Sequence, residues 1–394
     1  MKVICLGGAG RICREAILDL VEFSQFDQIT VADVNETEGR KVVAWLDDPR
    51  VDFARVDVRD QATTVAQMHG YDVVMDGTTI GLNGRSTACI AEAGCHGINL
   101  NGFGEEDASD PVFKRHGKTC VPGFGMTPGT TQMMAMHAAN QLDTVEVIRV
   151  SHGAYRPIAF SASITETTTY EYDPKLPGRV VYEDGQFVQV PPFARPREIA
   201  LPPPYGPSLE YIIPHAETKT LAKNLAHKGV RLIEVRGTWP QKNMQLIRAL
   251  YDWGFMRNDP IQVKGQSLGV MEAIAAYLMQ SPEGRETELY GYALHVEVVG
   301  TRGSERFRYT LWHTHPASDG SQPGWEQLRA YTRNVGIPLS IGAQMLAQGL
   351  VKPTGVITPE EAFEPEAIFA ELQHRQILIH LKTEKMDNGL CQCD

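Results

Sequence analysis

Hydrophobic residues in the first 121 positions fall into two alternating kinds of segment. Short apolar runs, such as residues 3–6, predict strands buried on both faces. Between these runs, apolar residues recur at helical spacing, as they do over residues 12–21. Strands that alternate with helices form parallel sheets covered on both faces, so this part predicts a doubly wound α/β domain. The predicted strands are at residues 3–6, 28–32, 51–56, 71–76, 97–100 and 119–121.

Beyond residue 145 this regular alternation is lost. A strand is predicted at residues 145–150, and hairpins are predicted around residues 183–185 and around Gly303. Residues 191–207 contain seven prolines and predict an irregular connection. The mixture predicts a mostly antiparallel α+β domain. Its helices are predicted at residues 218–226, 242–253 and 269–280.

The C-terminal part returns to a helical pattern. A helix is predicted at residues 338–348, and another begins at Thr358, where a hydroxyl cap precedes a proline. A closing strand is predicted at residues 377–382. We expect this part to pack back on the first domain. The predicted division of the chain is 1–125, 126–335, 336–385 and a flexible tail at 386–394.

Composition and charge restrict the class of partner. The chain has 394 residues, 22% of them charged, and a net charge of −11, which argues against nucleic acid or an anionic membrane as partner. No apolar run approaches the roughly 18 residues of a membrane-spanning helix. The chain has seven cysteines and no leader segment, which favours reduced thiols and a cytoplasmic location. No Cys/His spacing resembles a metal site, and the role of Cys391 and Cys393 stays open.

A glycine-rich turn connects the first predicted strand to the first helix. Strand, glycine turn and helix are the context that a dinucleotide-binding Rossmann unit requires. Gly7 allows the tight turn, and Gly10 allows the backbone to approach a pyrophosphate at the positive end of the helix. We therefore predict a pyridine-dinucleotide site. Its first members are Gly7, Gly8, Gly10, Arg11 and Ile12.

Two residues near this turn qualify the prediction. Cys13 stands where the third glycine of the fingerprint is expected, and we interpret it as a small packing substitute. Asp33 ends the second strand, 23 residues after Gly10, where a carboxylate binds the adenosine ribose hydroxyls. A carboxylate there repels the extra phosphate of NADP, and the nearest following basic residues are Arg40 and Lys41, so NAD is favoured over NADP. The alternative is an ordinary turn and a solvated strand end.

Further cofactor contacts are expected where the other parallel strands end, because ligands of such sheets bind at the carboxyl ends of the strands. Asp57 follows the third strand and either accepts from the adenine amino group or only forms a turn. Thr78 and Thr79 follow the fourth strand, and Asn101 follows the fifth.

Four segments together resemble one family. They are residues 6–12 (LGGAGRI), 122–129 (PGFGMTPG), 236–240 (RGTWP) and 354–363 (TGVITPEEAF). On these motifs the chain resembles the saccharopine dehydrogenase and lysine 6-dehydrogenase family. The resemblance implies a Rossmann domain, an inserted α+β domain for substrate binding and dimerisation, and a C-terminal return. It also implies NAD(P)-dependent oxidation of a C–N bond of an amino acid, or the reverse reduction, in a dimeric protein.

Polar residues of the second domain are candidates for the chemistry. Oxidising an amine needs a group that accepts its proton, and a substrate carboxylate needs an arginine or a helix N-terminus. Each candidate also has a purely structural interpretation, as a surface turn or as a complement to a helix dipole. The acid/base candidates are His152, Glu166 and His215, and the substrate-binding candidates are Tyr155, Arg156 and Glu217.

Three functions remain open from the sequence. The leading hypothesis is an NAD-dependent oxidoreductase that acts on an amino-acid-like small molecule. The second is an opine- or carboxypolyamine-type reductase that joins an amine to a carbonyl compound. The third is a dinucleotide-binding protein without turnover.

Overall fold

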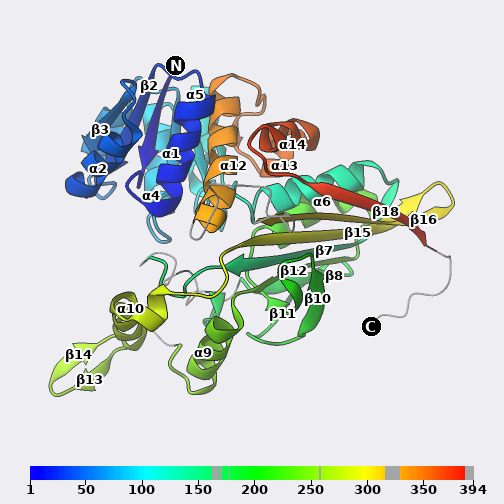
Figure 1. The fold of residues 1–394 in the computed structure, drawn as a ribbon. Helices are drawn as coiled ribbons and strands as arrows, with labels where there is room; N and C mark the ends of the chain where they lie inside the picture. The colour runs from blue at the N-terminus through cyan, green and yellow to red at the C-terminus, as the bar shows by residue number, and fades with distance from the viewer. Residues whose placement is uncertain (162–166, 168–170, 177, 257–258, 316–328, 387–394) are drawn as a thin grey trace. The chain divides into compact units, whose positions relative to one another are not determined.

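The computed structural model describes residues 1–161, 167, 171–176, 178–256, 259–315 and 329–386. The chain divides into two units (Figure 1). Unit 1 comprises residues 1–136 and 332–378, and unit 2 comprises residues 137–331 and 379–394. The sequence prediction placed the corresponding boundaries after residues 125 and 335.

Unit 1 is built on a seven-stranded sheet in which every pair of neighbouring strands is parallel. The six strands predicted in the first 121 residues are all present, and the seventh comes from the C-terminal part. Its order is β17-β6-β5-β4-β1-β2-β3. The strands are β1 (Lys2–Leu6), β2 (Gln28–Asp33), β3 (Val51–Arg55), β4 (Val73–Asp76), β5 (His96–Asn99), β6 (Thr119–Val121) and β17 (Gly355–Val356).

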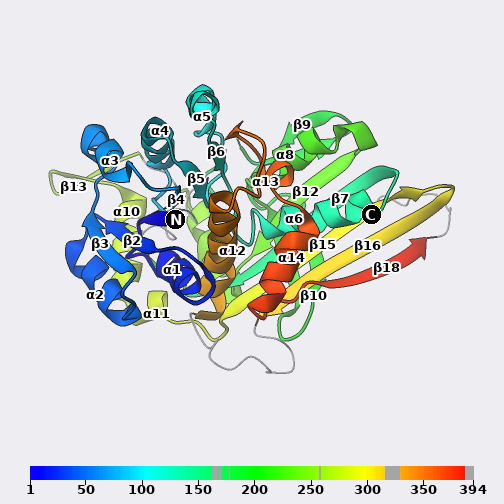
Figure 2. The same ribbon diagram turned by 90° about the horizontal axis from the view of Figure 1, so that it is seen from above.

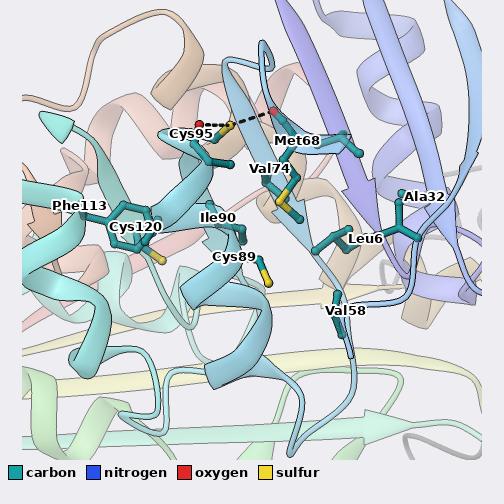
Figure 3. Packing of buried hydrophobic residues seen from close by; sticks show 14 residues of the cluster. Leu6, Ala32, Val58, Met68, Val74, Cys89, Ile90, Cys95, Phe113 and Cys120 are labelled. Atoms are coloured by element: carbon teal, nitrogen blue, oxygen red, sulfur yellow. Dashed lines mark hydrogen bonds between the residues drawn. The ribbon is translucent and has the colours of Figure 1, made fainter. Parts of the chain in front are cut away.

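Helices cover both faces of this sheet (Figures 1 and 2). One face carries α1 (Arg11–Phe23), α2 (Glu36–Leu46) and α12 (Arg329–Ala347). The other carries α3 (Gln61–Met68), α4 (Asn83–Ala93) and α5 (Asp110–His116). Under α3, α4 and α5, the fully buried Met68, Ile90 and Phe113 pack with apolar strand residues (Figure 3). The Cys95 thiol in this core donates to the carbonyl of Met68 at 3.3 Å.

The C-terminal segment of unit 1 is fixed to α1 by close packing and by a buried ion pair. A Cβ added at Gly336 of α12 would lie 2.8 Å from the Ile12 carbonyl oxygen, so only glycine fits there. Arg375 follows α14 (Pro365–His374), and its Nε lies 2.7 Å from the Asp19 carboxylate. Both side chains are buried, and the Arg375 guanidinium lies 4.5 Å from the ring centroid of Phe23. Ser340 also donates to Asp19, at 2.7 Å. The short helix α13 (Pro359–Ala362) starts at the predicted capping residue.

Unit 2 contains a nine-stranded mixed sheet. Only β7 and β12 pair in parallel among its described strand pairs, so the sheet is mostly antiparallel, as predicted. Its main path is β10-β11-β12-β7-β15-β16-β18, and β8 with β9 joins the other end of β12. The strands are β7 (Thr144–Tyr155), β8 (Val180–Glu183), β9 (Gln186–Gln189), β10 (Arg197–Leu201), β11 (Gly206–Ile212), β12 (Leu232–Thr238), β15 (Gly291–Arg302), β16 (Glu305–His315) and β18 (His380–Met386).

The remaining described elements of unit 2 are mainly helical. The helices predicted at residues 218–226, 242–253 and 269–280 are present with small shifts of their ends. A separate two-stranded sheet was not predicted. These elements are α8 (Glu217–Asn224), α9 (Gln241–Asp252), α10 (Val270–Gln280), α11 (Pro282–Arg285), β13 (Ile261–Val263) and β14 (Gln266–Leu268), and α6 (Thr130–Asn140) extends across the boundary between the units.

Two predictions differ from the structure. The proline-rich stretch 191–207 is not wholly irregular, because β10 and the start of β11 lie within it and pair antiparallel. The prolines at 202–204 form the turn between these strands, where missing N–H groups cost no ladder bonds. The closing strand lies at β18 and pairs with β16 of unit 2, so residues beyond 378 do not return to unit 1 as expected. The tail after Met386 lies outside the described residues.

Candidate functional site

The glycine turn of unit 1 has the geometry of a dinucleotide cradle. Gly7 has a φ of +64°, which glycine adopts without strain, and the Gly10 N–H donates to the Gly7 carbonyl at 2.9 Å. A Cβ added at Gly7 would lie 2.7 Å from the carbonyl oxygen of Gly77, which follows β4. The turn is therefore closed, bare of side chains and placed at the N-terminus of α1, as pyrophosphate binding requires.

Asp33 lies beside this turn. One of its carboxylate oxygens accepts from the Ala9 N–H at 3.1 Å, and the other accepts from the Asn35 N–H at 2.9 Å. Asn35 in turn caps α2 by accepting from the Glu38 N–H. In register, Asp33 is the partner of Arg55 on β3, a neighbour that the sequence did not reveal. The carboxylate is thus fixed at the position expected for a ribose-binding acid.

Cys13 occupies the position of the third glycine, and the structure shows how the chain makes room for its side chain. A Cβ added at Gly77 would overlap the Sγ of Cys13. The glycine that leaves room for close packing is therefore Gly77, in the loop after β4, and not a residue of α1. Burial, followed by the charges of Asp76 and Asp33, raises the pKa of Cys13 to about 12. The group is a packed thiol and not a nucleophile.

The close approach of Gly77 and Cys13 predicts that substitutions at these two positions have coupled effects on stability. Gly77→Ala is expected to lower the free energy of unfolding by about 1–3 kcal/mol, because its methyl group meets Cys13 Sγ. Cys13→Ala removes that sulfur and should restore most of the loss in the double variant. Urea unfolding of the wild type, both single variants and the double variant measures the coupling. Additive effects would contradict the assigned contact.

Two buried polar residues, which the sequence interpretation missed, shape the loops at this end of the sheet. Asp76 ends β4, accepts from the Thr78 N–H at 2.9 Å and accepts from the Ser86 hydroxyl. Burial raises the pKa of Asp76, and these hydrogen bonds oppose that rise. Asn99 ends β5 and accepts from the N–H groups of Asn101 and Gly123 at 2.9 and 3.1 Å. The sequence signal was a polar residue closing an otherwise apolar strand.

The other predicted cofactor residues are spread over the same strand ends. Thr78 and Thr79 lie in the loop that Asp76 holds, and Asn101 is buried after β5. Within the described residues, the Asn101 amide nitrogen has no hydrogen-bond partner, so it is available to a ligand. Asp57 instead pairs with Arg59 at 2.8 Å, which lowers the pKa of Asp57. This pairing supports the turn interpretation of Asp57 over adenine binding.

Unit 2 gathers a buried cluster of ionisable and aromatic side chains around β7 and the start of α8. The imidazole rings of His152 and His215 stack with their centroids 5.6 Å apart. His215 lies between two buried carboxylates, with Nδ1 3.4 Å from Glu217 and Nε2 3.8 Å from Glu171. Trp239 contacts His152 edge-on, with ring centroids 6.2 Å apart. We call these five residues the histidine cluster.

The two histidines differ in charge at neutral pH. Burial and then the positive charge of His215 lower the pKa of His152 to about 3. Burial lowers the pKa of His215 too, but Glu217 and Glu171 outweigh it and raise that pKa to about 10. His152 is therefore a neutral imidazole and His215 a cation. Among the described residues, His152 Nδ1 has no hydrogen-bond partner.

The segment 236–240 closes this cluster. A Cβ added at Gly237 of β12 would lie 2.7 Å from Cε1 of His152, so a glycine is required for the imidazole to lie there. Trp239, two residues later, forms the neighbouring wall. The motif RGTWP thus has a physical role in positioning His152.

The residues of unit 2 that were predicted from the sequence do not all lie in one cluster. His152, His215 and Glu217 come together in the histidine cluster. Tyr155 lies on the opposite face of β7, where its ring stacks on Tyr205 at 4.3 Å between centroids and its hydroxyl contacts Ser208. Arg156 is buried, with its guanidinium 5.4 Å from the ring centroid of Tyr331. Glu166 lies outside the described residues. Glu171 was missed, because it precedes no recognisable motif.

Comparison with known proteins gives the relationship. A family model described as the saccharopine dehydrogenase C-terminal domain matches residues 125–377. A second, described as the saccharopine dehydrogenase NADP binding domain, matches residues 3–121. The chain belongs to the saccharopine dehydrogenase family. It is accordingly an NAD(P)-dependent oxidoreductase of the kind that acts on the C–N bond of amino acids.

The fold is shared with a solved structure. The chain is similar to saccharopine dehydrogenase (L-Glu forming) from Saccharomyces cerevisiae, with a TM-score of 0.71, 12% identity, and coverage of 97% of this chain and 99% of that chain. A probable dehydrogenase from Thermotoga maritima gives a TM-score of 0.46 at 13% identity, over 98% of each chain. An amine dehydrogenase from Mycobacterium smegmatis gives 0.46 at 10% identity, over 92% of this chain and 97% of that one.

Three further observations concern this family member. The cradle of unit 1 fits the pyridine nucleotide of the family, since a bare glycine turn, a helix N-terminus and Asp33 lie together. Among the residues that the structure describes, no group of three or more His, Cys, Asp or Glu side chains is arranged to hold a metal ion. No helix in the described ranges is long and apolar enough to cross a membrane.

Proposed function

We propose that this chain uses NAD to oxidise the C–N bond of a basic or N-substituted amino acid, or catalyses the reverse reduction, with His152 as the proton acceptor. The observation that supports this most directly is the pairing of a neutral His152 with a cationic His215. Acid/base groups that differ in charge at one pH are typical of sites where protons are moved.

The chemistry assigns different roles to the two histidines. A bound nicotinamide nucleotide supplies the hydride acceptor for this reaction class. An ammonium group must lose a proton before its carbon can lose hydride, and of the two histidines only the uncharged one can take that proton. His152 meets this requirement, whereas His215 is already protonated and holds the carboxylates of Glu171 and Glu217 in place. Those carboxylates suit a substrate that carries a positive charge.

The choice of NAD over NADP rests on the surroundings of Asp33. The family model for residues 3–121 is described as NADP binding, and it supports a pyridine nucleotide in general. In this chain a carboxylate stands beside the glycine turn, and Arg40 and Lys41 are paired with Glu36 and Glu38. A 2′-phosphate would meet a negative charge at Asp33.

Replacing Asp33 tests that choice. Asp33→Ala is expected to lower kcat/KM for NAD by roughly 10- to 100-fold, the loss of a hydrogen bond to a charged group, and to raise kcat/KM for NADP. Steady-state kinetics with both nucleotides measure the change. A wild type that prefers NADP, together with a loss of NADP affinity in Arg55→Ala, would instead assign the 2′-phosphate to Arg55.

The proposed reaction is tested directly by turnover. Purified protein is assayed for NAD reduction with a panel that includes L-lysine, saccharopine and other N-substituted amino acids. Reduction of NAD with at least one of them is expected. NADH oxidation only in the presence of both an amine and a carbonyl compound would favour the condensing reductase. Tight NAD binding with no turnover in either direction would favour a binding protein.

We further propose a cytoplasmic homodimer. The five cysteines among the described residues are free thiols, which suits a reducing compartment. The dimer is expected from the family resemblance, and light scattering of the purified chain measures it.

A further inference from the structure

Arg179 is the largest fully buried side chain in the described part of the protein. It immediately precedes β8, and one of its terminal nitrogens donates to the carbonyl of Glu171. Its Nε and its other terminal nitrogen have no hydrogen-bond partner within the described residues. Burying a guanidinium that has two unused donors costs free energy of folding, unless a ligand accepts hydrogen bonds from those donors.

The carboxylate of the neighbouring Glu171 does not accept from the two unused donors of Arg179. The carboxylate of Glu171 is directed to His215, at 3.8 Å, and only its backbone carbonyl contacts Arg179. Burial lowers the pKa of the Arg179 guanidinium, and the influences of Tyr172, Glu171 and Asp173 oppose that shift only in part. An uncompensated buried charge destabilises a protein strongly, whereas a charge paired with a bound anion does not. A bound anion would accept from the two unused donors of Arg179.

Two more unused donors lie in the same region. The hydroxyl of Tyr172 and the indole N–H of Trp239 are buried and have no partner among the described residues. The two rings contact each other edge-on, with centroids 5.6 Å apart, and Trp239 also contacts His152. Through Trp239 and Glu171, the donor group around Arg179 is continuous with the histidine cluster.

We propose that Arg179 binds the carboxylate of the substrate, with Tyr172 and Trp239 as further donors. The planar guanidinium fork matches a carboxylate through two parallel N–H bonds. The proposal rests on the proposed function and deepens it, because it names the residues that recognise the carboxylate of the amino-acid substrate. Arg156, the clamp expected from the sequence, is the poorer candidate, since it donates to the Pro157 carbonyl at 3.3 Å and lies over Tyr331.

Kinetics with matched substrates test the assignment. If L-lysine is turned over, wild type is expected to favour it over its decarboxylated analogue, 1,5-diaminopentane, by roughly 100-fold in kcat/KM, as for a charge-assisted pair. Arg179→Met should remove this preference by lowering kcat/KM for L-lysine only, and Arg179→Lys should retain part of it. Arg231→Met is the matched control, because that exposed arginine pairs with Asp184 and should leave the preference unchanged.

A binding measurement separates this proposal from the failure of the proposed reaction. Sodium glutarate is expected to raise the thermal unfolding midpoint of wild type and of Arg231→Met above that in sodium chloride at equal ionic strength. Arg179→Met should show no such rise, even if no substrate is turned over. A wild type that glutarate does not stabilise would overturn the proposal without any variant. An equal rise in a folded Arg179→Met or an unchanged substrate preference would also overturn it.

Discussion

Replacing His152 with glutamine is expected to lower kcat by roughly 10²- to 10⁴-fold, the usual contribution of a general base. Glutamine is of similar size and polar, so it retains hydrogen bonding but cannot accept a proton from a substrate ammonium. The dissociation constant for NAD should not change, because the cradle at Gly7, Gly10 and Asp33 lies in unit 1. Steady-state kinetics and nucleotide titration measure the two quantities.

His227→Gln provides the control for this result, since His227 is an exposed histidine of the same unit. It should leave kcat unchanged.

A second readout comes from the pKa of His152, which is about 3 in the folded protein and near 6.5 in the unfolded protein. Between these values the unfolded state binds the extra proton, so stability falls as pH drops from 6.5 towards 3. His152→Gln should weaken this acid dependence. A kcat within twofold of wild type would exclude His152 as the base.

Replacing Arg375 with methionine is expected to lower the free energy of unfolding of unit 1 by about 3–5 kcal/mol. The change leaves the buried carboxylate of Asp19 without its cation and removes the contact with Phe23. A buried charge without a partner is strongly destabilising, and methionine has a similar length, so packing alone would not produce a loss of this size. Urea unfolding, followed by probes in unit 1, measures it.

A double variant distinguishes charge from packing at this site. Asp19→Asn combined with Arg375→Met removes both charges and should recover a large part of the stability lost in Arg375→Met. Lys114, which forms a more exposed ion pair with Asp110 at 2.8 Å, gives the surface comparison. Lys114→Met should cost less than about 1 kcal/mol. Equal losses in the two single variants would show that the ion pair of Arg375 has no special role.

The parts of the fold that the sequence predicted well are those determined by local pattern. The strands of the first 121 residues are short apolar runs or, at residues 51–55, an alternating one, and the glycine turn is followed directly by a helix. Asp33 was found because its distance from Gly10 along the chain corresponds to a fixed place in a βαβ unit. Likewise, the helix start at Thr358 depends only on residues within one turn.

The parts that were missed depend on partners distant in the chain. β10 and β11 form a hairpin despite the prolines, because Ile199 and Leu201 are buried against Tyr155 and Ala293. The role of Gly77 follows from the sulfur of Cys13, 64 residues earlier. The charge of His215 depends on Glu171 and Glu217 lying on both sides of its ring. None of these environments can be predicted from the spacing of hydrophobic residues along the chain.

The chain passes between its two units three times, after residues 136, 331 and 378. During synthesis on the ribosome, the first 121 residues provide six strands of the unit 1 sheet, but β17 and the partner of Asp19 emerge only after residues 137–331 of unit 2. Unit 1 can therefore be completed only after most of unit 2 has been synthesised. We conclude that the β6 edge of the unit 1 sheet stays unpaired, and able to pair with another chain, until β17 has been synthesised.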